Sequence, residues 1–234
     1  MARLPWEITR EMFLDEGETD ALLRHVRSAV RKGDERGRSA AELDRLIVES
    51  LVFSGLRSSE FCRLTLADTV VGHGLPAFVV AGPGANRRTV YLPGEASELV
   101  HRYVKEVRPA FLPAGAKSRD LRQALVLSEH GQPYERTGLY RRVVRILTEA
   151  GLGSRASVQL LRHTYGYLAY LRTGGNLLFV QRQLGHAHPM VTVVYARFVQ
   201  ESYADLAEAV ASTMTGRRRP AASPNRRTTR KESP

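Results

Sequence analysis

The chain has 234 residues, 43% of them hydrophobic, and one cysteine, Cys62. A single cysteine excludes an internal disulfide and an all-cysteine metal site, and no apolar run is long enough to span a membrane. Lys and Arg total 35 against 24 Asp and Glu, a formal net charge of +11 that indicates a polyanionic partner such as nucleic acid.

Part of this charge lies in a basic tail. Residues 216–234 carry seven Lys and Arg against one Glu, a net charge of +6, which leaves +5 for the rest of the chain. The tail is also rich in Pro and Ser, so we expect residues 215–234 to be disordered. No secretory signal is seen at the amino terminus, and we expect a cytoplasmic, nucleoid-associated protein.

The first elements in chain order are two helices. Apolar residues recur at helical spacing over 19–30, and a charged, glycine-containing loop is expected over 31–38. Ser39 is the predicted N-cap of the next helix, 40–54, with Glu42 as its capping-box partner.

Beyond this helix the pattern changes to strands. Gly55 ends the helix, and Ser58 begins another short one. Residues 77–80 and 88–92 are β-like runs, and the Gly- and Pro-containing segment 82–86 between them predicts a hairpin turn.

The rest of the chain is predicted to be helical. Residues 95–107 have helical spacing, and a Pro- and Gly-rich loop is expected to follow. Further helices are expected over 138–150, 157–172, 176–184 (capped by Asn176) and 201–214, with a short element over 190–198. The fold class predicted is therefore mainly α with a small antiparallel β-sheet, in one domain over residues 1–214.

Three motifs carry the chemistry: Gly55-Leu56-Arg57-Ser58-Ser59-Glu60, Leu161-Arg162-His163-Thr164, and Leu184-Gly185-His186 with Tyr195 nine residues later. Each has a plain structural interpretation when taken alone. Tyr195 alone is an ordinary core aromatic, Arg162 a structural ion pair, His163 a packed helix residue, and His186 a helix C-cap.

Together, in this order and spacing, the motifs resemble the catalytic domain of tyrosine recombinases, the phage integrase and Xer-like family. The resemblance runs from about Leu4 to Thr213 and implies the tyrosine recombinase catalytic-domain fold. It implies Tyr195 as the nucleophile, with Arg57, Arg162 and His186 as its catalytic partners.

The chemistry of the family explains these residue types. Tyrosine attack on a DNA phosphodiester adds negative charge to the nonbridging oxygens, and two arginines stabilise that charge with charge-assisted hydrogen bonds. A covalent 3′-phosphotyrosine keeps the bond energy, so the strand is rejoined without ATP. The reaction implied needs no cofactor and no metal.

Supporting roles are predicted for Glu60, which would orient Arg57, and for Gln159 and His163. Two positions depart from the family pattern. Pro83 stands where the family places a hairpin lysine that protonates the leaving oxygen, and Gln159 stands where it places a histidine. Arg87, Arg88, Arg141 and Arg142 are the predicted DNA-binding residues, but an arginine is a poor proton donor.

The partner implied is double-stranded DNA, bound by a homo-oligomer (a tetramer on DNA) or together with a partner recombinase. No separate N-terminal clamp domain is evident in the sequence. The altered proton-handling positions leave a second hypothesis open, a DNA-binding relative with lost or attenuated catalysis that acts as a regulator or accessory subunit. A helix-turn-helix transcription factor is a third, but it leaves the spacing from His186 to Tyr195 unexplained.

Overall fold

The computed structural model describes residues 8–72, 74–82, 86–115, 118–187 and 190–199. Its longer helices are α1 (Glu16–Lys32), α2 (Glu35–Ser54), α4 (Gly94–Arg102), α7 (Arg136–Glu149), α8 (Val158–Arg172) and α9 (Leu177–Leu184). Its short helices are α3 (Ser58–Arg63), α5 (Arg108–Phe111), α6 (Arg119–Gln123) and α10 (Met190–Val193), and its strands are β1 (Thr69–Val70), β2 (Ala77–Ala81) and β3 (Arg87–Tyr91).

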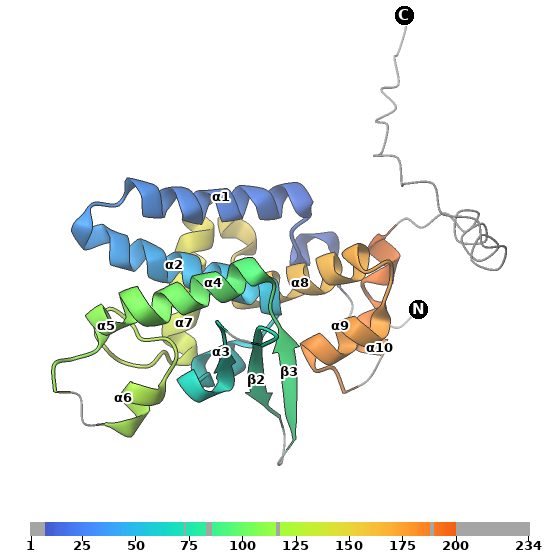
Figure 1. Ribbon diagram of the computed structural model, residues 1–234. Coiled ribbons are helices and arrows are strands. Elements are labelled where there is room, and N and C mark those ends of the chain that lie inside the picture. Colours follow the sequence, from blue (N-terminus) through green and yellow to red (C-terminus); the bar gives the residue numbers. More distant parts are fainter. Residues whose placement is uncertain (1–7, 73, 83–85, 116–117, 188–189, 200–234) are drawn as a thin grey trace, which may run out of the picture. The chain divides into compact units, whose positions relative to one another are not determined.

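Helix α2 is central to the domain, because α1, α4, α7 and α8 all pack against it (Figure 1). The face predicted to be apolar is fully buried, including Leu43, Ile47, Leu51 and Ser54. The described residues up to Phe198 belong to one compact unit. The domain is mainly helical with one small sheet, as the sequence predicts.

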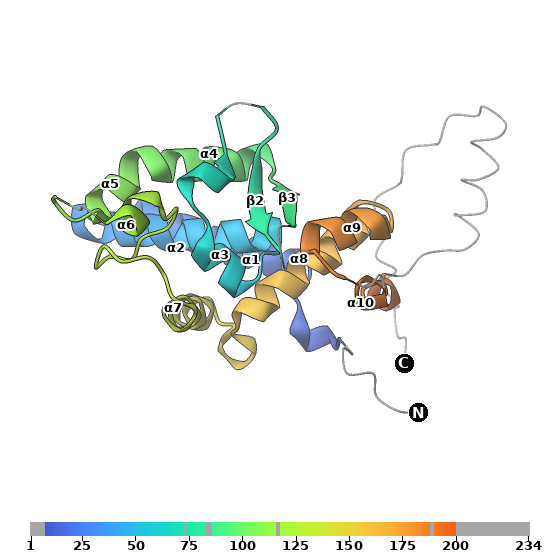
Figure 2. The same ribbon diagram turned by 90° about the horizontal axis from the view of Figure 1, so that it is seen from below.

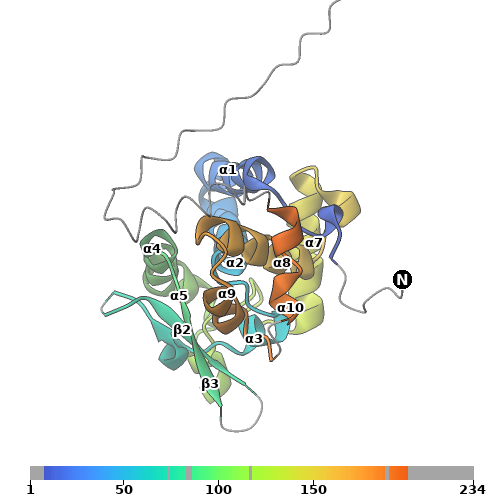
Figure 3. The same ribbon diagram turned by 90° about the vertical axis from the view of Figure 1, so that its right-hand side faces the viewer.

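The three strands form an antiparallel sheet in the order β1-β2-β3. Phe78 pairs with Val90 in the β2–β3 register, and both side chains are fully buried. Strand β3 lies against α9, and α9 contacts α10 in turn (Figure 3). This contact brings the sheet to the part of the chain that carries Tyr195.

The predicted start of α2 was wrong. Asp34 is the N-cap and accepts a hydrogen bond from the Gly37 amide at 2.8 Å, so the helix begins at Glu35 and the expected loop shrinks to two residues. Ser39 therefore lies within the helix, and Glu42 pairs with Arg102 of α4 at 2.9 Å instead of closing a capping box. Asp34 and Ser39 both precede the apolar face of this helix, and both residue types are favoured at an N-cap. The spacing of the apolar residues does not decide which of the two caps the helix.

The segment after α4 also differs from the expectation. The chain passes through a π-helical turn at Tyr103–Val107 and continues as α5. Pro109 lies in the first turn of α5, where a backbone N–H is not needed, so it does not end the helix. The expected loop is further interrupted by α6, seen from below in Figure 2.

Other predicted elements are confirmed, with boundaries within two residues: the β2–β3 hairpin, α7, α8, and α9 with its Asn176 cap. The structure adds that Ser157, expected as the first residue of α8, is its N-cap. The predicted helix over 201–214 and the basic tail lie outside the described residues. Among the described residues, no helix combines the length and apolar character needed to cross a bilayer.

Candidate active site

The turn between α2 and α3 presents Arg57. Gly55 caps α2 in the left-handed conformation, with φ of 61°, and a Cβ there would lie 2.5 Å from Tyr165 Cδ1. Glycine is therefore required by both backbone conformation and space. Arg57 follows as the N-cap of α3, and its own amide donates to Glu60 Oε2 at 2.8 Å.

Arg162 on α8 ties this turn to the end of α9. Its guanidinium donates to the Gly55 carbonyl at 2.5 Å and to the Leu184 carbonyl at 2.9 Å, and the residue is only 4% exposed. Burial, with repulsion from Arg57, lowers the pKa of Arg162 to about 10, so it is still charged at neutral pH. A guanidinium has five N–H groups, so donors remain for a ligand.

The end of α9 adds His186 and a backbone carbonyl. Gly185 ends the helix in the left-handed conformation, with φ of 65°, and its carbonyl accepts a hydrogen bond from Arg57 Nη2 at 3.1 Å. His186 Nδ1 lies 2.9 Å from the hydroxyl of Thr192, which is fully buried. Burial, together with Arg162 and Arg57, lowers the pKa of His186 to about 4.

Tyr195 lies beside His163, with its hydroxyl 3.1 Å from His163 Nδ1. The ring packs against α8 where Gly166 leaves room, since a Cβ on Gly166 would lie 2.3 Å from Tyr195 Cζ. Tyr195 is only 1% exposed, and burial raises the pKa of its phenol to about 12 although Arg162 opposes the shift.

His163 is held from its other side by Gln159, whose amide nitrogen lies 3.2 Å from His163 Nε2. Burial and then Arg162 lower the pKa of His163 to about 4, so the imidazole is neutral at pH 7. An amide nitrogen only donates, so in this orientation Gln159 donates to Nε2 and the ring proton lies on Nδ1, the nitrogen that faces Tyr195. With the Gln159 amide turned over, its oxygen accepts from Nε2–H, and the lone pair then lies on Nδ1. The sequence assigns His163 a supporting role, and the structure places it against the tyrosine hydroxyl.

Glu60 bridges two arginines. Oε1 accepts from Arg57 Nη1 at 2.9 Å and from Arg88 Nη1 at 2.7 Å, and Oε2 accepts from Arg88 Nη2 at 2.9 Å. Hydrogen bonds from Arg88 and from the Arg57 amide outweigh burial and hold the pKa of Glu60 at about 2. Glu60 is therefore ionised at every pH of practical interest.

The four arginines predicted to bind DNA have different surroundings. Arg141 is exposed, and Arg87 is exposed but paired with Asp68. Arg88 points into the site, toward Glu60.

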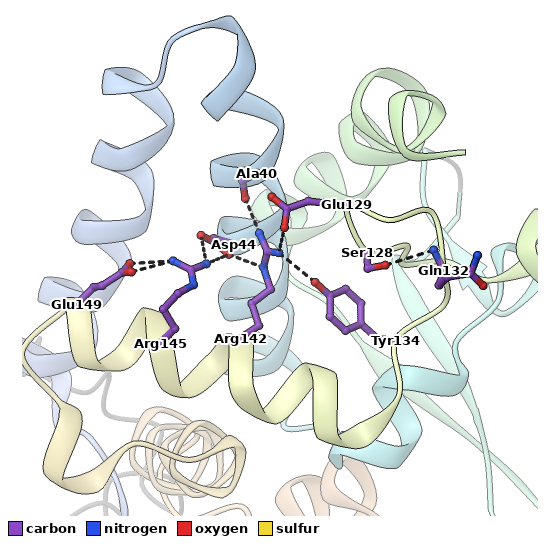
Figure 4. A network of polar contacts seen from close by, with 9 residues as sticks. All are labelled: Ala40, Asp44, Ser128, Glu129, Gln132, Tyr134, Arg142, Arg145 and Glu149. Atoms are coloured by element: carbon purple, nitrogen blue, oxygen red, sulfur yellow. Dashed lines mark hydrogen bonds and ion pairs between the residues drawn. The ribbon is translucent and has the colours of Figure 1, made fainter. Parts of the chain in front are cut away.

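Arg142 is committed elsewhere, which corrects the expectation that it contacts DNA. Its three nitrogens donate to Asp44 at 2.6 Å, Glu129 at 2.7 Å and the Ala40 carbonyl at 3.0 Å, and it also reaches the Tyr134 hydroxyl (Figure 4). Its side chain is 10% exposed. Arg142 is thus a structural residue that joins α7 to α2.

Pro83, the residue at the expected lysine position, lies outside the described residues. Within the ranges that the structure describes, no group of three or more His, Cys, Asp or Glu side chains is placed to hold a metal ion. Sequence reasoning did not find Thr192 or Gly166. A glycine in the middle of a helix was the available signal for Gly166, because it costs helix stability unless close packing requires it.

Comparisons with known proteins show which family and which fold this chain shares. The model of the phage integrase family matches residues 12–201. The tyrosine recombinase XerC of Halalkalibacterium halodurans is 31% identical over 163 residues, which are 70% of this chain and 52% of that relative. XerC of Mycobacterium bovis is 32% identical over 180 residues, 75% of this chain and 56% of that relative. The chain spans about half the length of the curated relatives it matches.

Solved structures share the fold. A crystal structure of the XerH site-specific recombinase bound to a palindromic difH substrate, in a post-cleavage complex, aligns with a TM-score of 0.66 at 25% identity, covering 87% of this chain and 53% of that one. The catalytic domain of bacteriophage HP1 integrase aligns with a TM-score of 0.53 at 19% identity, covering 88% of this chain and 98% of that one. The second likeness shows the fold alone.

Proposed function

Because the chain belongs to the phage integrase family, we propose that it is a site-specific DNA recombinase that cleaves and rejoins strands through a 3′-phosphotyrosine on Tyr195. The observation that carries the proposal is the convergence of the three sequence motifs. Arg162 donates to the carbonyls of Gly55 and Leu184, and Arg57 donates to that of Gly185, so the Arg57 turn and the His186 turn are held together.

The phosphate clamp consists of Arg57 and Arg162. Both guanidinium groups have N–H groups beyond those used within the domain. They would bind the nonbridging oxygens of the scissile phosphate and stabilise the charge that grows there during attack. Neutral His186, with Nδ1 engaged by Thr192, would donate from Nε2 to one of the same oxygens.

Tyr195 would be the nucleophile and His163 its base. The phenol oxygen forms a bond to phosphorus, the bond from phosphorus to the 5′-oxygen breaks, and the phenolic proton passes to His163 Nδ1 at 3.1 Å. This transfer requires the Gln159 amide to be turned so that its oxygen accepts from His163 Nε2–H. A 5′-hydroxyl from a second strand then reverses these steps and releases Tyr195. Since Tyr195 is 1% exposed, residues 190–198 must shift for the phenol to reach DNA.

The leaving 5′-oxygen also needs a proton. The hairpin segment from Gly82 to Asn86 contains no lysine, so this step differs from the family pattern.

Two clefts flank the site: one of about 670 Å³, lined by Arg88, Arg182 and His186, and one of about 750 Å³, lined by Arg63 and Gln159 among others. The exposed Arg182 of the first cleft and Arg63 of the second suit the backbone of double-stranded DNA on both sides of the scissile phosphate.

The assembly is part of the proposal. We infer that the protein acts on double-stranded DNA as a homo-oligomer, a tetramer on DNA, or with a partner recombinase, in the cytoplasm at the nucleoid. The XerH structure that resembles this chain is bound to DNA, which supports the DNA partner.

A trapping experiment tests the proposal. Duplexes that the protein selects from a random-sequence pool are resynthesised with a nick beside each candidate phosphate, so that cleavage releases a short fragment and cannot be reversed. We expect a covalent protein–DNA adduct with the wild-type chain and none with Tyr195→Phe. Tight binding with no wild-type adduct on any nicked duplex would contradict the proposal and favour a DNA-binding relative without catalysis.

A further inference from the structure

The strongest feature outside the assigned clamp is Arg88 on β3, and we propose that it is a positioning residue for Arg57. This inference rests on the proposed function. Arg88 neutralises the carboxylate of Glu60 and fixes the orientation of that carboxylate. The positive charge of Arg57 then stays available for the scissile phosphate. Arg88 itself does not contact the phosphate.

Three of the five N–H groups of Arg88 are used within the domain. Both terminal nitrogens donate to Glu60, at 2.7 and 2.9 Å, and Nε donates to the Gln183 carbonyl at 3.2 Å. The side chain is 18% exposed, compared with 44% for Arg57. Of the two arginines on Glu60, Arg57 is therefore the one turned to solvent.

Charge explains why a second arginine is needed. Glu60 is 10% exposed, and a carboxylate so close to Arg57 would cancel much of the potential that the clamp offers to a phosphate. With Arg88 also bound to Glu60, the side chains of Arg57, Glu60 and Arg88 together carry a net charge of +1. The bidentate contact to Arg88 thus satisfies the carboxylate and leaves a net positive charge at the clamp.

Geometry adds a second reason. The Arg88 guanidinium packs against the Gly185 turn, where a Cβ would lie 2.8 Å from Arg88 Cζ. The Gly185 carbonyl is the second acceptor for Arg57, at 3.1 Å. Gln183 also accepts from the Tyr91 amide through its side chain, at 3.1 Å, so β3 is fixed to α9 beside the clamp. Of the two acceptors that orient Arg57, Glu60 therefore bonds directly to Arg88, and Gly185 belongs to a turn that lies against the Arg88 guanidinium.

The test measures the rate of adduct formation under single-turnover conditions on the nicked duplex, with DNA affinity measured separately at several salt concentrations. For Arg88→Met we expect the rate to fall about 100-fold, the loss typical of a catalytic group displaced by about 1 Å. The Kd should change less than about threefold, and its salt slope should stay the same, because no phosphate contact is lost.

Rescue separates this role from a merely structural one. Glu60→Gln removes the negative charge that Arg88 balances, so the double variant Arg88→Met/Glu60→Gln should react faster than Arg88→Met alone. Arg88→Lys, which keeps the charge without the fork, should be intermediate. Arg102→Met, which breaks the Arg102–Glu42 pair between α4 and α2, is the matched control and should react like the wild type.

Three outcomes would overturn the inference: a wild-type rate in Arg88→Met, a double variant slower than Arg88→Met, or a salt slope reduced by about 0.9, the sign of a lost phosphate contact. If Arg88→Met does not fold, Arg88→Lys with and without Glu60→Gln gives the same comparison. A wild-type chain that forms no adduct would contradict the proposed function instead.

Discussion

At the scale of the residue, the contact between Tyr195 and His163 would govern how Tyr195 loses its proton in the proposed reaction. Burial raises the pKa of Tyr195 to about 12, so only about 1 phenol in 10⁵ is ionised at pH 7 without help. The same burial lowers the pKa of His163 to about 4 and keeps it neutral. Burial therefore has two effects at this contact. It keeps the Tyr195 phenol protonated, so that a base is needed, and it keeps the His163 imidazole neutral, so that it can accept the proton.

This pair predicts a change in pH dependence. With His163 as the base, the rate of adduct formation should be nearly flat from pH 6 to 9, because His163 is protonated only near pH 4. In His163→Phe, attack depends on the rare phenolate, so the rate should drop about 10²- to 10⁴-fold at pH 7 and rise about tenfold per pH unit. His130→Asn, at an exposed turn, is the control. A flat profile in His163→Phe would show that another group takes the proton.

Residue types and local spacing predicted the members of the site but not all their contacts. The motifs identify Arg57, Arg162, His186 and Tyr195 because each lies in a short stretch with a fixed order. The bond from Arg88 to Glu60 joins residues 28 apart, and that from His163 to Tyr195 joins residues 32 apart. Such pairings depend on how helices and strands pack, and no local pattern encodes them.

At the scale of the element, capping residues predicted the start of a helix correctly where the sequence offered only one candidate cap. Helix α9 follows a single predicted cap, Asn176, which accepts a hydrogen bond from the Phe179 amide. The start of α2 was missed because Asp34 and Ser39 compete. Strand β1 was missed because two residues carry no detectable alternation.

Helix α7 is the element whose anchoring can be tested. Arg142→Met removes a side chain that is 10% exposed and leaves Asp44 and Glu129 without one partner each, so we expect a loss of about 3 kcal/mol in the free energy of unfolding. The control is Arg145→Met on the same helix, which also contacts Asp44 but is 46% exposed and should cost about 1 kcal/mol or less.

Urea unfolding measures both losses, and equal losses in the two variants would contradict the structural role given to Arg142. DNA binding provides an independent check. In native buffer the salt slope of Arg142→Met should match that of the wild type, since its nitrogens are committed to Asp44, Glu129 and the Ala40 carbonyl.

At the scale of the whole molecule, the two half-buried histidines of the site couple stability to pH. His163 and His186 have pKa values of about 4 in the folded chain, below the value of about 6.5 expected when unfolded. The unfolded chain therefore binds more protons between pH 4 and 6.5. Stability should fall as the pH falls through that window, by up to about 1.4 kcal/mol per pH unit for each histidine.

Urea unfolding at pH 7, 5.5 and 4.5 tests this coupling. His163→Phe should reduce the slope between pH 5.5 and 4.5 by about 1.4 kcal/mol per pH unit, because one of the two groups no longer titrates. An unchanged slope in that variant would mean that His163 is not held neutral by burial.

The central claim is that Tyr195 becomes covalently linked to DNA. Mass analysis of the trapped adduct after tryptic digestion tests it most directly, since cleavage after Arg182 and Arg197 gives a peptide over 183–197 that contains a single tyrosine. We expect this peptide to carry the nucleotide, with the phosphate joined to the phenol oxygen and to a 3′-oxygen of the DNA. An adduct on any other peptide, or one joined through a 5′-phosphate, would contradict the assignment.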